Sequence, residues 1–350
     1  METMIMKIDY DDMDLSIIKE AAQIIRNGGI VAFPTETVYG LGANALDQES
    51  VKKIYLAKGR PSDNPLIVHI SSIEELYPLV ESIKLKAKIL MDLFWPGPLT
   101  LIFPKSKIIP DSITAGLSTV AVRMPDNKIA RELIKYSGVP IAAPSANISG
   151  SPSPTKAEHV IKDLNGKIDM ILDGGSVRVG LESTVLDVTR DTPVILRPGG
   201  ITKEMLEKAI GEVLIDSAII SEKEFVDTPM APGMKYKHYS PKAKLVIVEG
   251  EINKVIEKIN SLAKENKEQK LKVGIMATEQ TRENYQADLI LSVGDRDKAE
   301  TIAAKLFDTL RAFDEAGIDI IFSESFSYEE IGFAIMNRLK KAAGYNILRV

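Results

Sequence analysis

The segment KLVIVEGEINKVIEKINSLAKENKEQKLKVGIMAT, residues 244–278, carries the pattern that decides the fold class. It begins with an apolar run, KLVIV, continues with an amphipathic stretch over 252–265, and ends in a second apolar run, KVGIMAT. Short apolar runs separated by helical periodicity are typical of strand–helix–strand units whose strands run parallel. The segment therefore predicts an α/β protein.

The alternation continues to the C-terminus. It predicts a helix near 279–285, a strand over 288–293, a helix over 297–316, a strand over 318–324 and a helix over 328–343. With right-handed crossovers, these elements form a small parallel, Rossmann-like sheet. Its first strand–helix junction, VEGEINK, has no glycine-rich phosphate fingerprint, so the sequence leaves the role of this domain open.

The N-terminal part shows the same kind of alternation. Strands are expected over 29–33, 65–70, 99–104, 119–125, 140–144, 170–174, 183–188 and 193–197, and helices over 15–27, 84–94, 127–137, 155–164 and 202–210. Ser50 and Thr155 are the expected N-caps of two helices. The pattern stops at 216–241, a linker rich in proline and glycine. We therefore divide the chain into a catalytic domain (1–215), a linker or lid (216–241) and a C-terminal domain (242–350).

Composition excludes several functions. The 350 residues hold 44 Lys+Arg and 49 Asp+Glu, a net charge of −5, with three histidines and no cysteine. Disulfides, thiolate nucleophiles and thiolate zinc sites are excluded, and a metal site rich in histidine is not expected. The acidic balance lacks the basic footprint of nucleic-acid binding, although a local basic groove stays open. The acidic start METMIMKIDYDD and the absence of a long apolar run predict a cytoplasmic protein without a membrane span.

The loop PTETVYGLG (34–42) places two hydroxyls and bare amides at a sheet edge, which suits either a small polar ligand or an ordinary turn. Gly40, Gly42 and Ala45 have G-x-G-x-x-A spacing. PTETVY separates them from the preceding strand, so the dinucleotide-binding reading is disfavoured.

Four cations fall at the ends of predicted elements beside small polar loops: Lys58, Arg60, Arg123 and Arg197. Lys58 and Arg60 either stabilise a helix dipole or clamp a phosphate. Arg123 shares a strand face with Thr119 and forms either a core salt bridge or a carboxylate contact. Together the four indicate one polyanionic small ligand.

Seven motifs occur in order: GIVAFPTETVYGLG, KGRPSDNPLIVHI, WPGPLTLIF, STVAVRMP, PIAAPSANISG, LESTVLDV and ILRPGG. They resemble the YrdC-type family of L-threonylcarbamoyl-AMP synthases, and APGMKYKHYSP with the domain after it resembles the long, two-domain members. The resemblance implies a twisted mixed sheet with flanking helices. It implies a nucleotidyltransferase that makes threonylcarbamoyl-AMP and pyrophosphate from ATP, L-threonine and bicarbonate.

The resemblance also assigns residues. Lys58 and Arg60 match the family's basic motif and carry the catalytic role. The nucleotide contacts it implies are Arg60, Asn64, Thr119, Ser145, Asn147, Ser153, Arg197 and, from the linker, Tyr236. The threonine contacts it implies are Thr35 or Thr37, His69, Arg123, the backbone of Ala143, and Ser183. From the residues alone, His69 in its apolar strand is more often structural.

Mg²⁺ is expected to bind mainly through the ATP phosphates, with no dedicated protein metal site. The family's product passes to a tRNA threonylcarbamoyltransferase, for modification next to the anticodon; direct contact with tRNA stays open. Two competing functions are an RNA-binding module that makes no adenylate and a carbamoyl-transfer module. The acidic balance and the lack of interleaved aromatic residues argue against the first, and the lack of cysteines for a zinc finger argues against the second.

Overall fold

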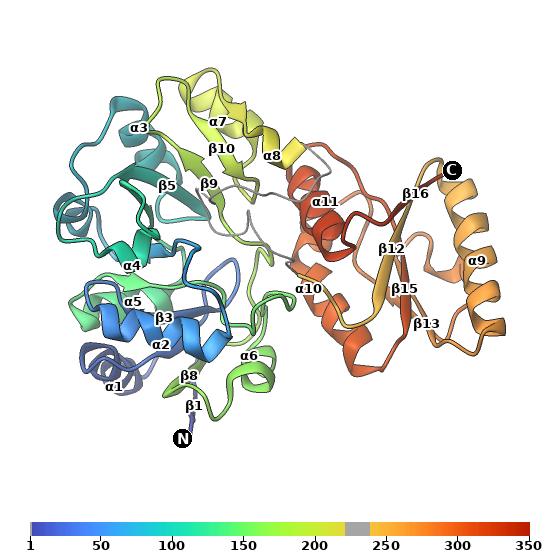
Figure 1. The fold of residues 1–350 in the computed structure, drawn as a ribbon, viewed down its shortest axis with the longest axis horizontal. Coiled ribbons are helices and arrows are strands. Elements are labelled where there is room, and N and C mark those ends of the chain that lie inside the picture. The colour runs from blue at the N-terminus through green and yellow to red at the C-terminus, as the bar shows by residue number, and fades with distance from the viewer. Residues whose placement is uncertain (1, 221–238) are drawn as a thin grey trace. The chain divides into compact units, whose positions relative to one another are not determined.

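The computed structural model describes residues 2–220 and 239–350. The chain divides into two compact units (Figure 1). The first contains residues 2–149 and continues from Ser153, and the second contains the C-terminal part together with Gly150–Pro152. In the described residues, no helix is long and apolar enough to cross a membrane.

The first unit is built on an 11-stranded mixed sheet with the order β1-β8-β2-β3-β7-β4-β6-β5-β9-β10-β11. Its strands are β1 (Met4–Lys7), β2 (Val31–Phe33), β3 (Gly40–Asn44), β4 (Ile67–His69), β5 (Leu99–Pro104), β6 (Thr119–Arg123), β7 (Ile141–Ala142), β8 (Met170–Asp173), β9 (Thr184–Asp187), β10 (Val194–Arg197) and β11 (Leu214–Ile215). The strand predicted over 99–104 is found with these bounds, the other predicted strands are shorter than expected, and β1, β3 and β11 were not predicted.

Helices cover both faces of this sheet. They are α1 (Leu15–Arg26), α2 (Gln48–Lys58), α3 (Leu85–Phe94), α4 (Asp111–Thr114), α5 (Lys128–Ser137), α6 (Ala157–Leu164), α7 (Lys203–Ile210) and α8 (Ser217–Ile220), with 3-10 turns η1 (Ile73–Glu75) and η2 (Tyr77–Leu79). Helices α1 and α5 pack on each other and form one apolar core with β2 and β8. The larger core lies under α2, α3, α6 and α7.

Two predicted N-caps are wrong. Helix α2 begins at Gln48, and its N-cap is Asp47, whose carboxylate accepts from the amide of Glu49 at 3.1 Å. Ser50 lies inside the helix and donates to Asp47. Helix α6 has Lys156, not Thr155, at its N-cap position.

Gly40 and Gly42 lie within strand β3, not in a nucleotide-binding loop. A Cβ built on Gly42 would come within 2.7 Å of the Phe33 ring and 2.8 Å of the Ile141 side chain. The two glycines therefore allow the Phe33 ring to lie against the strand. The need for room beside the Phe33 ring therefore accounts for the two glycines of the G-x-G-x-x-A spacing at Gly40, Gly42 and Ala45.

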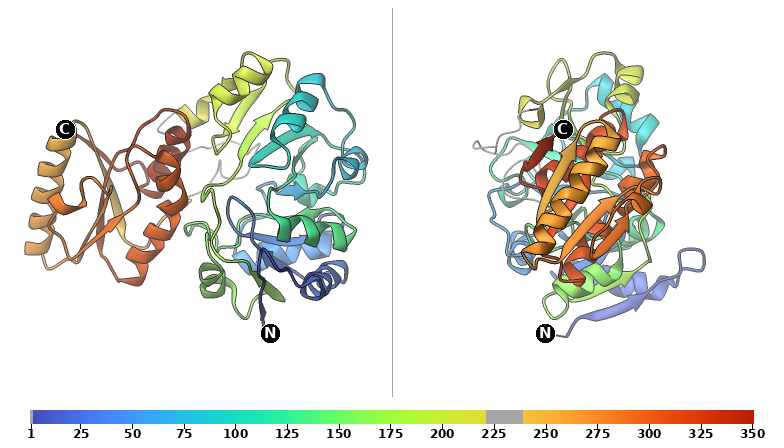
Figure 2. Two further views of the ribbon diagram at one scale, coloured as in Figure 1. Left: turned by 180° about the vertical axis from the view of Figure 1, so that it is seen from behind. Right: turned by 90° about the vertical axis from the view of Figure 1, so that its right-hand side faces the viewer.

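The second unit has five strands in the order β14-β13-β15-β12-β16, all parallel, as predicted for this domain. Its elements are β12 (Lys244–Glu249), α9 (Ile252–Glu268), β13 (Val273–Ala277), η3 (Arg282–Asn284), β14 (Leu289–Ser292), α10 (Ala299–Glu315), β15 (Ile320–Glu324), α11 (Ile331–Ala342) and β16 (Ile347–Arg349). Helix α9 lies on one face of the sheet, and α10 and α11 lie on the other (Figures 1 and 2). The helix predicted near 279–285 is only the short turn η3.

Candidate active site

Two parallel strands, β4 and β6, set the geometry of the site. They pair in register, with His69 opposite Arg123 and Ile67 opposite Ala121. His69 and Arg123 therefore lie at the carboxyl ends of their strands, whereas Thr119 begins β6 at the other end. At about 3.3 Å per residue, Thr119 and Arg123 lie about 13 Å apart. Within β4 and β6, the predicted threonine contacts His69 and Arg123 thus lie at the opposite end from the predicted nucleotide contact Thr119.

The sheet face that carries Arg123 also carries a small apolar cluster. Alternation along the strands places every second residue on one face. The members of this cluster are Ile67, Ile102, Ala121, Val185, Val194 and Leu196. The polar side chains at the strand ends therefore border an apolar floor, an arrangement common in sites for small organic ligands.

The loop between β2 and β3 is held by its own hydroxyls. Thr35 Oγ1 donates to the carbonyl of Val38 at 2.6 Å and accepts from the amide of Thr37 at 3.1 Å. The hydroxyls of Thr35 and Thr37 lie 2.9 Å apart. Because Thr35 has only one hydroxyl hydrogen, which goes to Val38, Thr37 donates in this pair. Thr35 shapes the turn, and Thr37 faces the neighbouring strand.

Arg123 is the centre of the cluster, with only 4% of its surface exposed. Its Nη1 donates to Thr37 Oγ1 at 3.0 Å, its Nε donates to the carbonyl of Gly97 at 3.3 Å, and its Nη2 lies 2.5 Å from Glu36 Oε2. The two hydrogen bonds use two of the five N–H groups of a guanidinium, and the ion pair with Glu36 lacks hydrogen-bond geometry. Both predicted readings, a buried ion pair and a ligand carboxylate, are therefore compatible with one side chain.

His69 is buried and neutral. Burial, and then the positive charge of Arg123, lower its pKa from 6.5 to about 3. Its Nδ1 donates to the carbonyl of Ile67 at 3.2 Å, since a carbonyl can only accept. Because the His69 ring is neutral, the positive charge at this end of the strands comes from Arg123 and Arg197.

A second polar group lies at the start of β9. Ser183 Oγ is 2.7 Å from Thr100 Oγ1 and accepts from Arg197 Nη2 at 3.1 Å, and Arg197 Nε donates to the carbonyl of Ser183 at 3.0 Å. Thr100 is opposite Arg123 in the β5–β6 ladder. Ser153 Oγ donates to Glu182 Oε1 at 2.5 Å, next to Ser183. The structure therefore brings the predicted Ser183 and Arg197 into direct contact.

Lys58 and Arg60 leave the end of α2 in different ways. Lys58 is 2% exposed, and its ammonium donates to the carbonyls of Ser145 and Asn147 at 2.5 and 2.6 Å. Arg60 is only partly buried and donates to the carbonyls of Asn64 and Pro65, both at 3.3 Å. Lys58 therefore holds the loop that carries the predicted nucleotide contacts.

The remaining predicted residues are placed as follows. The amide of Ala143 donates to the carbonyl of Ile67 at 3.0 Å, which leaves the Ala143 carbonyl for a ligand. Asn64 Oδ1 is buried and accepts no hydrogen bond from a described residue. Tyr236, with most of the predicted lid, lies outside the described residues. No group of three or more acidic or histidine side chains suited to a metal occurs in 2–220 or 239–350.

Sequence reasoning missed three polar residues of this cluster: Glu36, Thr100 and Glu182. Glu36 lies in the loop 34–42, between two threonines, and is the only charged residue of that motif. This isolated carboxylate could have indicated a functional residue. Thr100 lies in an apolar strand and gives no signal of its own. Its role depends on the pairing of β5 with β6.

The second unit has its own buried acid. Glu324, at the end of β15, is fully buried, pairs with Arg296 and accepts from the hydroxyl of Tyr285 at 2.8 Å. Burial and the charge of Glu324 raise the pKa of Tyr285. All the described contacts of this network lie within the second unit. We therefore interpret the Glu324–Arg296 pair as structural, and it can be compared with the Glu36–Arg123 pair of the site.

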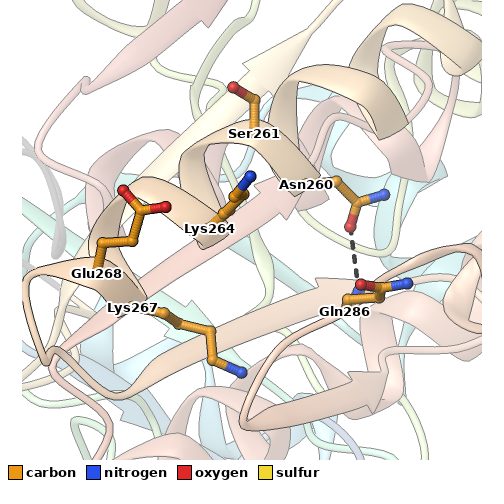
Figure 3. Close-up of a pocket in the computed structure, with 6 residues that line it drawn as sticks. All are labelled: Asn260, Ser261, Lys264, Lys267, Glu268 and Gln286. Carbon is orange, nitrogen blue, oxygen red and sulfur yellow. Dashed lines mark hydrogen bonds between the residues drawn. The ribbon is translucent and has the colours of Figure 1, made fainter.

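A surface pocket of the same unit lies beside α9 (Figure 3). Its lining residues are Asn260, Ser261, Lys264, Lys267, Glu268 and Gln286. Asn260 accepts from the amide of Gln286 at 3.0 Å, and Lys267 pairs with Asp288 at 3.2 Å. The pocket contains none of the residues predicted for catalysis.

Comparison with known proteins gives the family. The model described as "Telomere recombination" matches residues 23–199, and that described as "Threonylcarbamoyl-AMP synthase, C-terminal domain" matches 201–344. Threonylcarbamoyl-AMP synthases of Pyrococcus abyssi and Bacillus subtilis are 53% and 54% identical over 333 residues. That alignment covers 95% of this chain and 96% and 94% of theirs.

The solved structures agree. The crystal structure of P. abyssi Sua5 complexed with L-threonine has a TM-score of 0.94 at 52% identity, over 99% of this chain and 100% of that one. Escherichia coli YciO has a TM-score of 0.52 at 28% identity, over 56% of this chain and 96% of that one.

Fold, site and matches define a class: a two-domain α/β nucleotidyltransferase of tRNA modification. Within it, the chain belongs to the family of threonylcarbamoyl-AMP synthases, and its product serves the threonylcarbamoyladenosine modification of tRNA. The predicted family, fold class and reaction are confirmed. The competing predictions, an RNA-binding module without synthesis and a carbamoyl-transfer module, are set aside.

Proposed function

We propose that the chain assembles threonylcarbamoyl-AMP along β4 and β6, with L-threonine at the carboxyl ends and ATP toward the amino ends. The observation that carries this proposal is that His69 and Arg123 lie at one end of β4 and β6 while Thr119 lies at the other, with Ser183 and Arg197 in contact beside the Arg123 end. The threonine bound in the relative from P. abyssi supports threonine as the amino-acid substrate. Between the two ends, the apolar floor keeps the reacting groups close and excludes water.

For threonine, we propose that Arg123 binds the carboxylate, since its two hydrogen bonds, to Thr37 and Gly97, leave further N–H groups for a ligand. Thr37, rather than Thr35, makes the threonine contact, because Thr37 already touches Arg123. His69, Ser183 and the carbonyl of Ala143 complete this end. The low pKa of His69 keeps it a neutral hydrogen-bonding group at physiological pH.

For ATP, Arg60 contacts the phosphates, and Lys58 orders the loop that carries Ser145 and Asn147. A fixed ammonium under this loop adds positive potential without touching the phosphates. Asn64, with its unsatisfied buried oxygen, and Thr119 lie at the same end. The further nucleotide contacts are Ser153, Arg197 and, from the linker, Tyr236. Ser153 and Arg197 lie at the threonine end, beside Glu182 and Ser183, so the nucleotide extends toward the threonine.

The chemistry needs no protein nucleophile. The threonine nitrogen adds to bicarbonate or CO₂ to give a carbamate, a carbamate oxygen attacks the α-phosphorus, and pyrophosphate leaves. The chain contributes positioning and fixed positive charge. Mg²⁺ is held mainly by the phosphates of ATP.

We also propose the cytoplasm as the place of action, because the product passes to a tRNA threonylcarbamoyltransferase. Residues 1–215 form the catalytic domain, 216–241 a linker that closes over the nucleotide, and 242–350 the C-terminal domain. Whether the chain itself contacts tRNA is left to direct binding measurements.

The test is product analysis by mass spectrometry after incubation with ATP, bicarbonate and either threonine or serine. Threonylcarbamoyl-AMP is expected with threonine, with pyrophosphate release that requires all three substrates. Arg60→Ala is expected to lower the rate by about 10²-fold, because one fixed charge at the phosphates is lost. Lys52→Ala, which removes an exposed cation of the same helix, serves as the control. Equal rates for Arg60→Ala and wild type would refute the assignment of Arg60.

A further inference from the structure

Glu36 is a buried carboxylate in the middle of the proposed threonine site. It is 3% exposed, lies between Thr35 and Thr37, and its Oε2 forms the 2.5 Å ion pair with Arg123. Neither of its oxygens accepts a well-formed hydrogen bond from a described residue. Oε1 therefore has no partner within the described part of the chain.

A buried carboxylate with an oxygen left over is costly. An ionised carboxylate accepts up to about four hydrogen bonds, and removal from water without replacement donors disfavours the charged form. Native proteins seldom leave such groups unsatisfied unless a ligand completes them. The unsatisfied oxygen of Glu36 therefore indicates that a ligand supplies the missing hydrogen-bond donor.

The backbone holds Glu36 in place. The amide of Val179 donates to the carbonyl of Glu36 at 2.7 Å, and the amide of Gly180 donates to the carbonyl of Thr37 at 3.1 Å. Thr35 closes the turn on the other side. The carboxylate is therefore preorganised beside Arg123, the condition under which a fixed charge acts strongly on a ligand.

We propose that Glu36 binds the ammonium group of L-threonine and takes the proton that this group must lose before it reacts. This inference rests on the proposed function. Threonine is a zwitterion, and the Glu36–Arg123 pair offers one charge to each of its ends: Arg123 to the carboxylate and Glu36 to the ammonium. The neighbouring titratable and charged groups are His69, Arg197 and Glu182. His69 and Arg197 carry no negative charge, and the Glu182 carboxylate accepts from the Ser153 hydroxyl.

The proton transfer balances. One ammonium proton moves to Glu36, and the nitrogen lone pair forms the N–C bond with bicarbonate. The C–OH bond of bicarbonate breaks, and its hydroxide leaves as water with a second proton from the nitrogen. Glu36 then releases its proton to solvent. The products are the carbamate, one water and one proton.

The alternative is a purely structural ion pair, and Glu36→Gln separates the two. It preserves the shape of the side chain and removes its charge. We expect threonine to bind at least about tenfold more weakly by calorimetry. Binding of 3-hydroxybutanoate, which lacks only the ammonium group, should change little. An equal loss for both ligands would mean that Glu36 only positions Arg123, and no loss would also overturn the proposal.

The pH profile gives a second readout. At neutral pH we expect kcat to fall on the order of 10²-fold in Glu36→Gln. The rate should recover as the pH approaches the pKa of the threonine amino group, because the free amine then needs no base. A constant ratio to wild type across the pH range would overturn the role in proton transfer. Glu324→Gln, which neutralises a buried paired glutamate in the second unit, controls for general loss of stability.

One measurement needs no variant. In a crystal of the wild-type chain with threonine, the amino nitrogen should lie within about 3.2 Å of a Glu36 oxygen. A nitrogen bonded only to other groups would overturn the proposal even if Glu36→Gln failed to fold. If the wild type made no product that depends on threonine and bicarbonate, the proposed function itself would be wrong. This outcome is distinct from every result of the Glu36 experiments, because it is measured on the wild-type chain.

Discussion

At the scale of single residues, Tyr39 connects three loops around the site. Its hydroxyl donates to the carbonyl of Gly175 at 2.6 Å and accepts from the amide of Gly174 at 3.2 Å. Its backbone bonds to Pro154 and Ala146, in the loop after β7. Burial, and then the charge of Asp173, raise its pKa, so the buried phenol is a neutral donor.

Tyr39→Phe should lower the free energy of unfolding by about 1 kcal/mol, because it leaves the partly buried amide of Gly174 and the carbonyl of Gly175 without their partner. Urea unfolding measures the difference. Tyr10→Phe, at a side chain that is largely exposed, should change stability by less than about 0.5 kcal/mol. A Tyr39→Phe variant as stable as the Tyr10→Phe variant would show that the phenol bonds contribute nothing.

His69 makes stability depend on pH. Its pKa is about 3 in the folded chain and about 6.5 when unfolded, so the folded state binds fewer protons. The stabilisation is complete above pH 6.5 and is lost as the pH falls toward 3. Between these values, wild type should lose up to about 1.4 kcal/mol per pH unit more than His69→Asn. Parallel stability curves from pH 4 to 7 would contradict this assignment.

At the scale of elements, the adjacent glycines Gly199 and Gly200 differ in the space available for a side chain, so one position tests the packing after β10 and the other serves as its control. A Cβ on Gly199 would lie 2.4 Å from the amide nitrogen of Thr184 and 2.6 Å from the carbonyl oxygen of Glu182. A Cβ on Gly200 would meet nothing closer than the Pro98 ring at 3.4 Å. The first glycine thus lets the strand end that carries Ser183 pass close to β10.

Gly199→Ala should displace this strand end, cost about 1–3 kcal/mol of stability and weaken threonine binding. Gly200→Ala should leave both within error, since its contact is ordinary packing. Thermal unfolding and threonine calorimetry on the two variants make the comparison. Equal behaviour of the pair would show that the backbone adjusts without disturbing Ser183.

Elements with strong apolar patterns were predictable, and those without them were not. Strands β5 and β6 were found with correct or nearly correct bounds because each is a short apolar run, LTLIFP and TVAVR. Strand β3, with two glycines, has no such pattern and exists because Phe33 and Ile141 pack on it. Strand β1 needs β8, whose residues follow it by more than 160 positions, so no local signal could reveal it.

At the scale of the whole molecule, the linker can be tested by truncation. A chain ending at residue 220 retains β11 and α8, and Ile219 packs against the main core, so it should fold. We expect it to bind threonine like the full chain and to form product at least about tenfold more slowly, because the proposed lid is missing. Undiminished synthesis would leave the linker and the C-terminal domain without a role in catalysis.

The sequence by itself determined the α/β class, the parallel C-terminal sheet, the family and most of the polar residues of the site. Local periodicity and motifs that are continuous along the chain are enough to indicate these properties. Tertiary structure decided which of these residues meet. It buried Lys58 under its loop, separated the roles of Thr35 and Thr37, and paired Arg123 with Glu36. The contacts of Lys58 with its loop and of Arg123 with Glu36 and Thr37 join residues far apart in sequence, and they depend on strand register and burial, which no local pattern encodes.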